Sequence, residues 1–187
     1  MENTKAFRVD PVLKKGRPES NDGLLEKEIK TYDLLDELGI EYMRASHDPA
    51  DTIEDCIEVE KVIGVHICKN LFLCNRQMTK FYMLMLPGNK PFKTKDITHQ
   101  IGSSRLSFAP ADKLLEMLDL TPGSVSIMAL RNDVNNDVQL ILDREIYESE
   151  YVRCHPCINT ATLKIKTKDI LEKYLPFVHH EPVIVDL

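Results

Sequence analysis

A lysine and an asparagine interrupt an otherwise apolar segment of the chain. Lys69 and Asn70 lie in the middle of the run Val65–Cys74. In an extended strand successive side chains point to opposite faces, so each polar group has apolar neighbours on its own face. A buried ammonium loses its hydration unless another group compensates. A lysine in this setting is typical of a fixed positive charge that holds an anionic or carbonyl group. The alternative is a lysine that reaches solvent at a strand end.

The sequence Cys154-His155-Pro156-Cys157 invites two other interpretations. A C-x-x-C pair lowers the pKa of a thiol, but redox pairs of this type usually open a helix, whereas a predicted strand precedes this one. A zinc site built on Cys154 and Cys157 would need a second pair, and no other cysteines have the required spacing. We therefore expect two buried thiols flanking a His-Pro turn, and we keep a thiol redox protein as an alternative.

Other familiar motifs are incomplete or absent. Asp133, Asn135 and Asp137 alternate as in a calcium loop, but Val138 stands at the glycine position and Arg144 at the glutamate position. This excludes an EF-hand and favours a hairpin turn. The chain has no G-x-S-x-G, P-loop or G-x-G-x-x-G sequence, which argues against the familiar hydrolase, nucleotide and dinucleotide sites. We expect no metal and no cofactor.

The charge of the chain is unevenly distributed. The 187 residues are 43% hydrophobic and 29% charged, with a formal net charge of −6, so the molecule as a whole is not a basic nucleic-acid binder. Between Lys61 and Lys95, however, seven basic residues occur without a single Asp or Glu. Such a stretch would attract a polyanion to one place. The alternative is a basic face that only solubilises a hairpin.

The sequence predicts a cytoplasmic protein without a membrane anchor. The longest strongly apolar run, Phe81–Leu86, is far shorter than the roughly twenty residues of a membrane span. The first residues have neither the apolar core of a signal peptide nor the pattern of a transit peptide. Five cysteines in a chain of this size favour reduced thiols in a cytosol.

Apolar spacing predicts one domain after an N-terminal arm. The arm covers residues 1–22, and the domain covers residues 23–187. Helices are expected near 25–38, 53–63, 94–101, 112–118 and 168–175, and Thr52 with Asp55 predicts a capping box at the second of them. Strands are expected near 40–42, 65–74, 79–86, 105–109, 124–130, 138–142, 151–155, 161–165 and 183–185. This order predicts an α/β (α+β) fold with a mixed, mostly antiparallel, barrel-like sheet surrounded by helices.

Several short motifs, taken in order, resemble one known family. They are Lys69-Asn70-Leu71-Phe72-Leu73, Leu86-Pro87-Gly88, Arg105-Leu106-Ser107-Phe108-Ala109, Thr121-Pro122-Gly123-Ser124-Val125, Asn132-Asp133, His155-Pro156 with Asn159-Thr160-Ala161-Thr162, and His180-Glu181-Pro182. Their order and spacing are similar to those of the prolyl-tRNA synthetase-associated editing domains of the YbaK/ProX type, and within these to the alanyl-tRNA(Pro) deacylases. The resemblance covers roughly residues 24–187.

The resemblance implies a trans-editing aminoacyl-tRNA deacylase that maintains translation fidelity by hydrolysing mischarged tRNA(Pro), typically Ala-tRNA(Pro). A synthetase pocket built for proline cannot strongly exclude a smaller side chain, because missing methylenes cost only about 1–3 kcal/mol. The implied partners are the acceptor end of aminoacylated tRNA(Pro) and prolyl-tRNA synthetase. No metal is implied, and the oligomeric state is left open.

The same resemblance assigns roles to individual residues. Lys69 and Gly123 are implied as catalytic: the lysine fixes the 3′ end of the tRNA and stabilises negative charge, and the loop opened by Gly123 donates backbone N–H groups. Asn70, Ser124 and His155 are implied to bind the substrate, with His155 narrowing the amino-acid pocket. Four basic residues of the body, which could contact acceptor-stem phosphates, complete the prediction: Lys80, Lys90, Lys93 and Arg105.

Two departures from the family leave alternatives open. The family loop reads Gly-x-x-x-Pro, whereas this chain has Ile127 in place of the proline. Isoleucine restricts the backbone less than proline does, so the shape of the loop is less firmly fixed. Cys154 and Cys157 stand where bulkier apolar residues are common, so the pocket at His155 differs in shape. The same chemistry on Cys-tRNA(Pro) is one alternative. A non-catalytic regulator that binds charged tRNA is the other.

Overall fold

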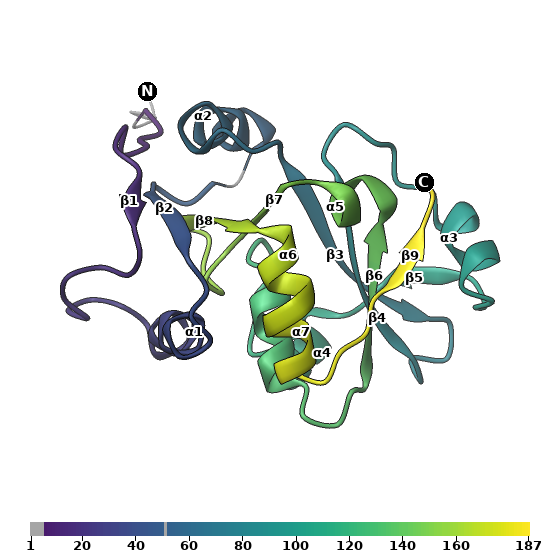
Figure 1. Cartoon of the computed structure of the whole chain (residues 1–187). Coiled ribbons are helices and arrows are strands. Elements are labelled where there is room, and N and C mark those ends of the chain that lie inside the picture. The colour runs from purple at the N-terminus through teal and green to yellow at the C-terminus, as the bar shows by residue number, and fades with distance from the viewer. Residues whose placement is uncertain (1–5, 51) are drawn as a thin grey trace.

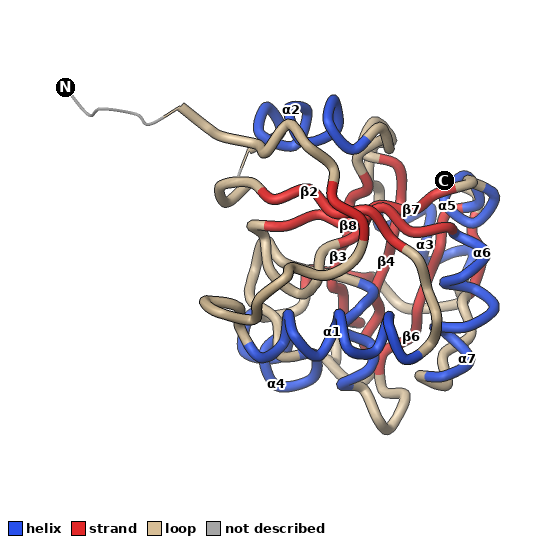
Figure 2. Tube along the Cα trace, turned by 60° about the vertical axis from the view of Figure 1, so that its left-hand side comes forward, coloured by secondary structure: helices blue, strands red, loops and turns tan. Residues whose placement is uncertain are grey.

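Two β-sheets with helices on their outer sides form the body of the protein (Figures 1 and 2). The computed structural model describes residues 6–50 and 52–187. The first sheet has the strand order β1-β2-β8-β7 and the second the order β5-β3-β4-β6-β9. The strands are β1 (Lys14–Lys15), β2 (Tyr42–Ser46), β3 (Cys68–Asn75), β4 (Phe81–Pro87), β5 (Leu106–Phe108), β6 (Val138–Asp143), β7 (Tyr151–Cys154), β8 (Ala161–Lys166) and β9 (Val183–Val185).

The helices connect and cover these strands. They are α1 (Glu26–Glu37), α2 (Ile53–Ile63), α3 (Thr94–Gln100), α4 (Ala111–Leu118), the 3₁₀ helix η1 (Ile127–Asn132), α5 (Arg144–Glu148), α6 (Thr167–Asp169), the π-helical segment η2 (Ile170–Tyr174) and α7 (Leu175–Phe177). Among the described residues, none of these helices is both long and apolar enough to cross a membrane.

The hairpin β3–β4 at the centre of the second sheet separates two apolar clusters. Lys69 lies opposite Leu86 and Asn70 lies opposite Met85 in the antiparallel register. Because paired residues point to the same face, Lys69 faces the cluster that contains Leu86, whereas Asn70 faces the larger cluster that contains Met85. The hairpin therefore presents the two polar side chains to opposite sides of the sheet.

Helix α2 begins and ends as the sequence predicts. The Thr52 side chain accepts from the backbone N–H of Asp55, and the Asp55 side chain accepts from the N–H of Thr52, which completes the capping box. Gly64 ends the helix in the left-handed region, with φ 66°. This end leads directly into β3, so the two helix boundaries fix where Lys69 enters the sheet.

The predicted α+β class is confirmed, with two differences of detail. The sheets do not close into a barrel: strands β4, β6 and β9 pair in parallel and the remaining pairs are antiparallel, in two separate sheets. Residues 124–130 are not a strand, because Ser126 accepts from the N–H of Met128 and starts η1 instead. The described part of the predicted N-terminal arm, from residue 6 on, adds β1 to the edge of β2.

Candidate active site

Lys69 is half-buried and its ammonium has a definite partner. Its Nζ donates to the backbone carbonyl of Lys90 at 2.7 Å. Lys90 lies three residues beyond the end of β4, at the open end of the β3–β4 hairpin, and its own N–H donates to the carbonyl of Pro87. The ammonium is therefore held at the end of the hairpin. The alternative from the sequence, a lysine that reaches solvent at a strand end, would require it to extend freely into solvent, which it does not. Because an ammonium has three N–H donors, two remain for another group.

Asn70 connects the opposite face of β3 to the loop that follows Gly123. Its Nδ2 donates to the carbonyl of Val125 at 3.1 Å. Its Oδ1 is buried and has no hydrogen-bond partner in the described part of the chain. An unpaired buried acceptor costs about 1–3 kcal/mol, so this oxygen is an unusual feature next to the loop that follows Gly123.

The loop from Gly123 to Ile127 is held at both ends. Gly123 has φ 88°, a left-handed conformation that favours glycine, and the space where a Cβ would stand is empty. The N–H of Ser124 donates to the carbonyl of Thr121 within the turn. Ile127, which replaces the family proline, is buried in the core, and its carbonyl accepts from the Tyr174 hydroxyl at 3.0 Å. Core packing thus fixes the end of the loop that lacks the proline.

His155 lies beside this loop and is neutral. The Ser126 hydroxyl donates to the backbone carbonyl of His155, which joins the two segments. The ring Nδ1 lies 3.0 Å from the carbonyl of Ala161, which can only accept, so Nδ1 carries the proton and Nε2 has a free lone pair. Burial lowers the pKa of His155 to about 4 and outweighs the hydrogen bond that the ring donates to the Ala161 carbonyl, which raises the pKa.

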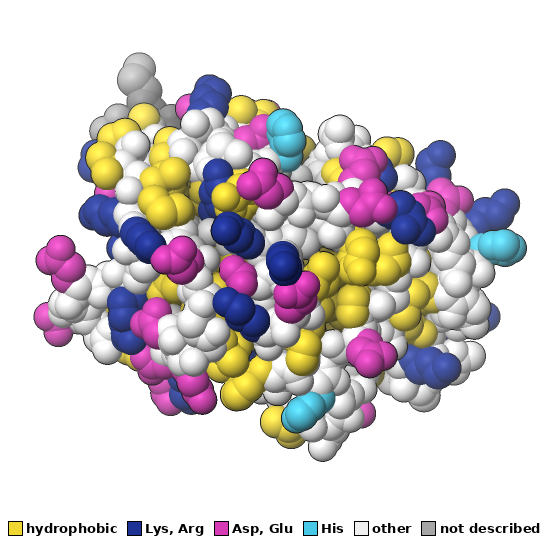
Figure 3. Space-filling model, viewed as in Figure 1, with side chains coloured by type: hydrophobic (Ala, Val, Ile, Leu, Met, Phe, Trp, Pro, Cys, Tyr) yellow, Lys and Arg dark blue, Asp and Glu magenta, His cyan; other side chains and the backbone are white. Residues whose placement is uncertain are grey.

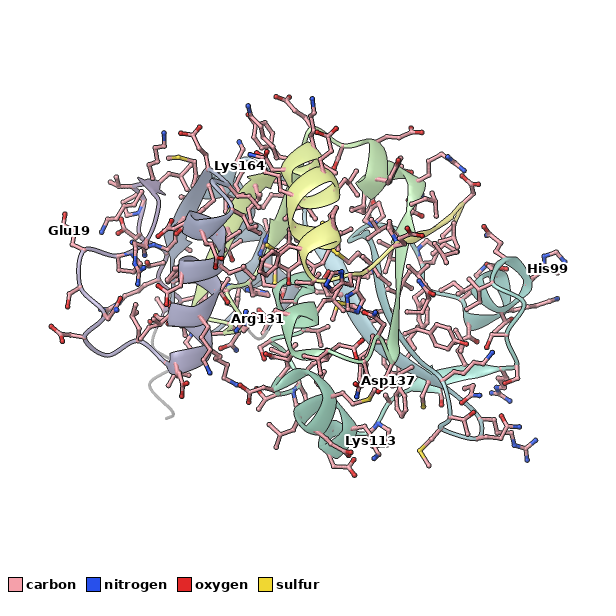
Figure 4. All side chains as sticks on the ribbon, turned by 60° about the horizontal axis from the view of Figure 1, so that its bottom comes forward. Glu19, His99, Lys113, Arg131, Asp137 and Lys164 are labelled. Carbon is pink, nitrogen blue, oxygen red and sulfur yellow. The ribbon has the colours of Figure 1, made fainter. Side chains whose placement is uncertain are left out.

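Arg131 braces the same region from η1, and sequence reasoning did not identify it. Its Nη1 donates to the Thr31 hydroxyl at 2.7 Å and its Nη2 to the carbonyl of Lys27 at 2.7 Å, both on α1. Nη1 also lies 3.5 Å from Cys157 Sγ. Figure 4 shows Arg131 between these elements. A long-range contact of this kind has no local sequence signal.

The two cysteines beside His155 are buried thiols. Burial raises the pKa of both Cys154 and Cys157, which disfavours the thiolate that redox chemistry and metal binding require. All cysteines are free, and the described residues contain no cluster of three side chains that could hold a metal ion. The structure therefore gives no support to the redox alternative.

The predicted tRNA-binding residues fall into two groups. Lys80, Lys93 and Arg105 are exposed. Lys90 is largely buried, and its ammonium is paired with the carboxylates of Asp143 and Glu145. Figure 3 shows basic and acidic side chains interspersed on one face of the molecule, so the acid-free stretch of sequence does not produce a basic patch on that face.

Two cavities adjoin the site. One of about 550 Å³ lies between α2, the segment 64–68, the turn 87–89 and α5. The other, of about 320 Å³, is lined by Ser124, Thr121 and residues 157–160 together with the start of α1. Ser124 is the one predicted site residue that lines either of these two cavities. Asn70, the Gly123 loop and His155 are joined by hydrogen bonds, whereas Lys69 lies on the other face of β3.

The fold and this site define an aminoacyl-tRNA editing domain. The family model described as "Aminoacyl-tRNA editing domain" matches residues 47–173, and the chain belongs to that family. The predicted class of enzyme, a hydrolase that acts on the ester bond of aminoacyl-tRNA, agrees with this membership. The chain is 36% identical over 136 residues to the prolyl-tRNA editing protein ProX of Acetoanaerobium sticklandii, covering 73% of this chain and 83% of that one.

A second relative and two solved structures are also similar to the chain. The chain is 30% identical over 164 residues to prolyl-tRNA synthetase associated domain-containing protein 1 of Danio rerio, covering 86% of each chain. A solved structure of a candidate trans-editing enzyme for prolyl tRNA synthetase matches with a TM-score of 0.63 at 13% identity, over 88% of this chain and 99% of that one. The crystal structure of the protein APE2540 matches with a TM-score of 0.62 at 18% identity, over 78% of this chain and 92% of that one. These two likenesses concern the fold alone.

Proposed function

We propose that the protein is a trans-editing deacylase that hydrolyses the ester of mischarged tRNA(Pro), with Ala-tRNA(Pro) as its principal substrate. The observation that carries this proposal is the group around Asn70. Hydrogen bonds join three features in one place: a buried acceptor oxygen that has no partner among the described residues, a neutral imidazole whose Nε2 can accept, and a loop opened by Gly123. These are the groups that an α-ammonium and an ester carbonyl need.

In this mechanism Asn70 Oδ1 and His155 Nε2 accept hydrogen bonds from the α-ammonium of the alanyl group. Water attacks the ester carbonyl and is oriented by the ribose hydroxyl of the substrate. Since the Ser124 N–H already donates within the turn, the neighbouring Gly123 and Val125 amides are the donors for the developing oxyanion. The ester C–O bond then breaks, and the ribose oxygen leaves with a proton from water.

Lys69 acts on the nucleotide end of the substrate. One of its N–H groups is used by the Lys90 carbonyl, and the other two hold the 3′-terminal phosphate and stabilise negative charge. Lys80, Lys93 and Arg105 contact phosphates of the acceptor stem. The protein works in the cytoplasm, where it meets tRNA released by prolyl-tRNA synthetase.

The size of the amino-acid pocket separates alanine from its competitors. Two hydrogen bonds fix His155: the Ser126 hydroxyl donates to its backbone carbonyl, and its ring Nδ1 donates to the Ala161 carbonyl. The ring therefore narrows the amino-acid pocket rigidly. A rigid wall excludes proline by overlap and disfavours the larger cysteine side chain. Cys-tRNA(Pro) is therefore the second substrate to test.

The experiment is a panel of Ala-tRNA(Pro), Cys-tRNA(Pro) and Pro-tRNA(Pro), each incubated with the purified protein under single-turnover conditions. We expect release of alanine at least 10-fold faster than cysteine, and no release of proline above the uncatalysed rate. Faster release of cysteine would change the assigned substrate. Tight binding of all three without release of any amino acid would show a regulator and contradict the proposal.

A further inference from the structure

The contact of Lys69 with the chain depends on the placement of one carbonyl. Lys69 Nζ donates to the Lys90 carbonyl at 2.7 Å, and this is the hydrogen bond that fixes the ammonium at the end of the hairpin. The carbonyl belongs to a loop residue just beyond β4, and not to the sheet itself. A loop carbonyl holds its position only if the side chain or neighbours of that residue are anchored.

The Lys90 side chain provides such an anchor. Its Nζ lies 2.9 Å and 3.0 Å from the two carboxylate oxygens of Asp143, and 2.7 Å from Oε1 of Glu145. Asp143 is fully buried at the end of β6. It also accepts from the backbone N–H groups of Glu145 at 2.9 Å and Leu187 at 3.3 Å, so α5 and the last residue converge on the same carboxylate.

This arrangement ties Lys90 to the interior. Burial opposes the charge of the Lys90 ammonium, but the hydrogen bonds to Glu145 and Asp143 outweigh that cost and raise its pKa. If the ammonium moved away to contact a phosphate, it would leave the buried Asp143 carboxylate without its cation, which is strongly unfavourable. Lys90 is therefore unlike Lys80, which is exposed and available to a ligand.

We infer that Lys90 and Asp143 are positioning residues for Lys69, and that Lys90 does not contact tRNA. The buried ion pair fixes the Lys90 backbone, whose carbonyl in turn sets the direction of the Lys69 ammonium toward the substrate. This inference rests on the proposed function, because it gives Lys69 a role in ester hydrolysis. If Lys90 positions Lys69, loss of its side chain lowers the rate of the chemical step. If Lys90 contacted a phosphate, the same loss would weaken binding of the tRNA.

The test compares two lysines with the same substitution. Lys90→Met and Lys80→Met are assayed on Ala-tRNA(Pro) over a series of salt concentrations, with kcat and KM determined separately. Lys80→Met is expected to raise KM, leave kcat unchanged and reduce the slope of log KM against log salt by about one, as loss of one phosphate contact does. Lys90→Met is expected to lower kcat about 10-fold or more and to leave the salt slope unchanged, and Lys90→Arg is expected to restore most of kcat.

The outcomes separate this inference from the proposed function. If Lys90→Met shows the pattern of Lys80→Met, or keeps full kcat, the positioning role is wrong while the deacylase remains. If the wild-type protein releases no alanine, the proposed function itself fails and the inference fails with it. If Lys90→Met does not fold, the double variant Lys90→Met/Asp143→Asn removes both buried charges, and the same loss of kcat with an unchanged salt slope is expected of it.

Discussion

The two faces of strand β3 hold their polar residues in different ways. On one face, the Asn70 amide donates to the Val125 carbonyl of the loop that follows Gly123, and its Oδ1 has no hydrogen-bond partner among the described residues. On the other face, the Lys69 ammonium is bonded to a loop carbonyl that a buried ion pair anchors. The first arrangement leaves polar groups available to a ligand. The second holds the Lys69 ammonium in one orientation.

The difference matches the two ends of the proposed substrate. An aminoacyl group is small and needs hydrogen-bond donors and acceptors, which in the proposed mechanism are the Asn70 oxygen and the backbone amides of the loop that follows Gly123. A nucleotide terminus carries a phosphate and needs a cation that stays in place, which the Lys69 side supplies. The two groups are carried by adjacent residues of β3, whose side chains point to opposite faces of the sheet.

The largest expected effect comes from removing the fixed charge. Lys69→Ala should reduce release of alanine from Ala-tRNA(Pro) by at least about 100-fold, in the range seen when an electrostatic contact to a transition state is removed. The measurement is single-turnover deacylation, with circular dichroism to show that the variant is folded. Lys80→Ala serves as the matched control, and its chemical step should be unchanged. A folded Lys69→Ala protein with normal activity would contradict the catalytic role.

A smaller effect is expected from the opposite face. Asn70→Ala removes both the substrate acceptor and the donor to the Val125 carbonyl, so we expect activity to fall about 10-fold and the free energy of unfolding to fall by about 1–3 kcal/mol. Urea denaturation measures the second quantity. Loss of stability with unchanged activity would show that Asn70 only supports the loop and would remove it from the substrate pocket.

A modest effect is expected from the loop itself. Gly123→Ala meets no steric obstacle, but a residue with a Cβ is strained at φ 88°, at a cost of about 1 kcal/mol. Because relief of that strain reorients the backbone amides, we expect activity to fall more than stability. Thermal denaturation and the deacylation rate together check this. Equal activity in a fully stable variant would mean that these amides do not contact the substrate.

The smallest effect concerns the protonation of His155. With its pKa lowered from 6.5 to about 4, the ring stays neutral down to about pH 4, while the unfolded chain binds this proton from about pH 6.5. The unfolded state therefore binds more protons in this window, and stability decreases as the pH falls from about 6.5 to about 4. An NMR titration of the His155 ring checks the value. A normal pKa near 6.5 would show an exposed ring and contradict the neutral acceptor.

The sequence predicts local features of the fold well. The capping box of Thr52 and Asp55, the helix end at Gly64 and the strand Val183–Val185 are all confirmed, because each depends on residues close together in the chain. The strand predicted at 124–130 is wrong. Residues 127–130 are all buried, so the segment has no polar face by which its sequence could distinguish a strand from a helix. The Ser126 hydroxyl, which accepts from the N–H of Met128, caps the 3₁₀ helix η1 there.

The site could be predicted only as a set of residues, and not as an arrangement. The resemblance assigned site roles to Lys69, Asn70, Gly123 and His155 from their motifs, and these roles stay predictions. That Asn70 bonds to Val125, and Ser126 to His155, depends on contacts between distant segments that no local pattern encodes. The helix α5 was missed for a related reason. It has five residues, too few for a period, and it begins because the Asp143 side chain accepts from the N–H of Glu145.

The most direct test of the central claim is to locate the aminoacyl end of the substrate on the protein. The chain has no tryptophan, so intrinsic tryptophan fluorescence cannot report binding and NMR is the suitable method. The probe is tRNA(Pro) that carries alanine through a non-hydrolysable amide. The account predicts the largest changes in the side-chain amide of Asn70, the backbone amides of Gly123 and Val125, and the ring of His155. Changes confined to the cavity between α2 and α5, with the Asn70 amide unaffected, would contradict it.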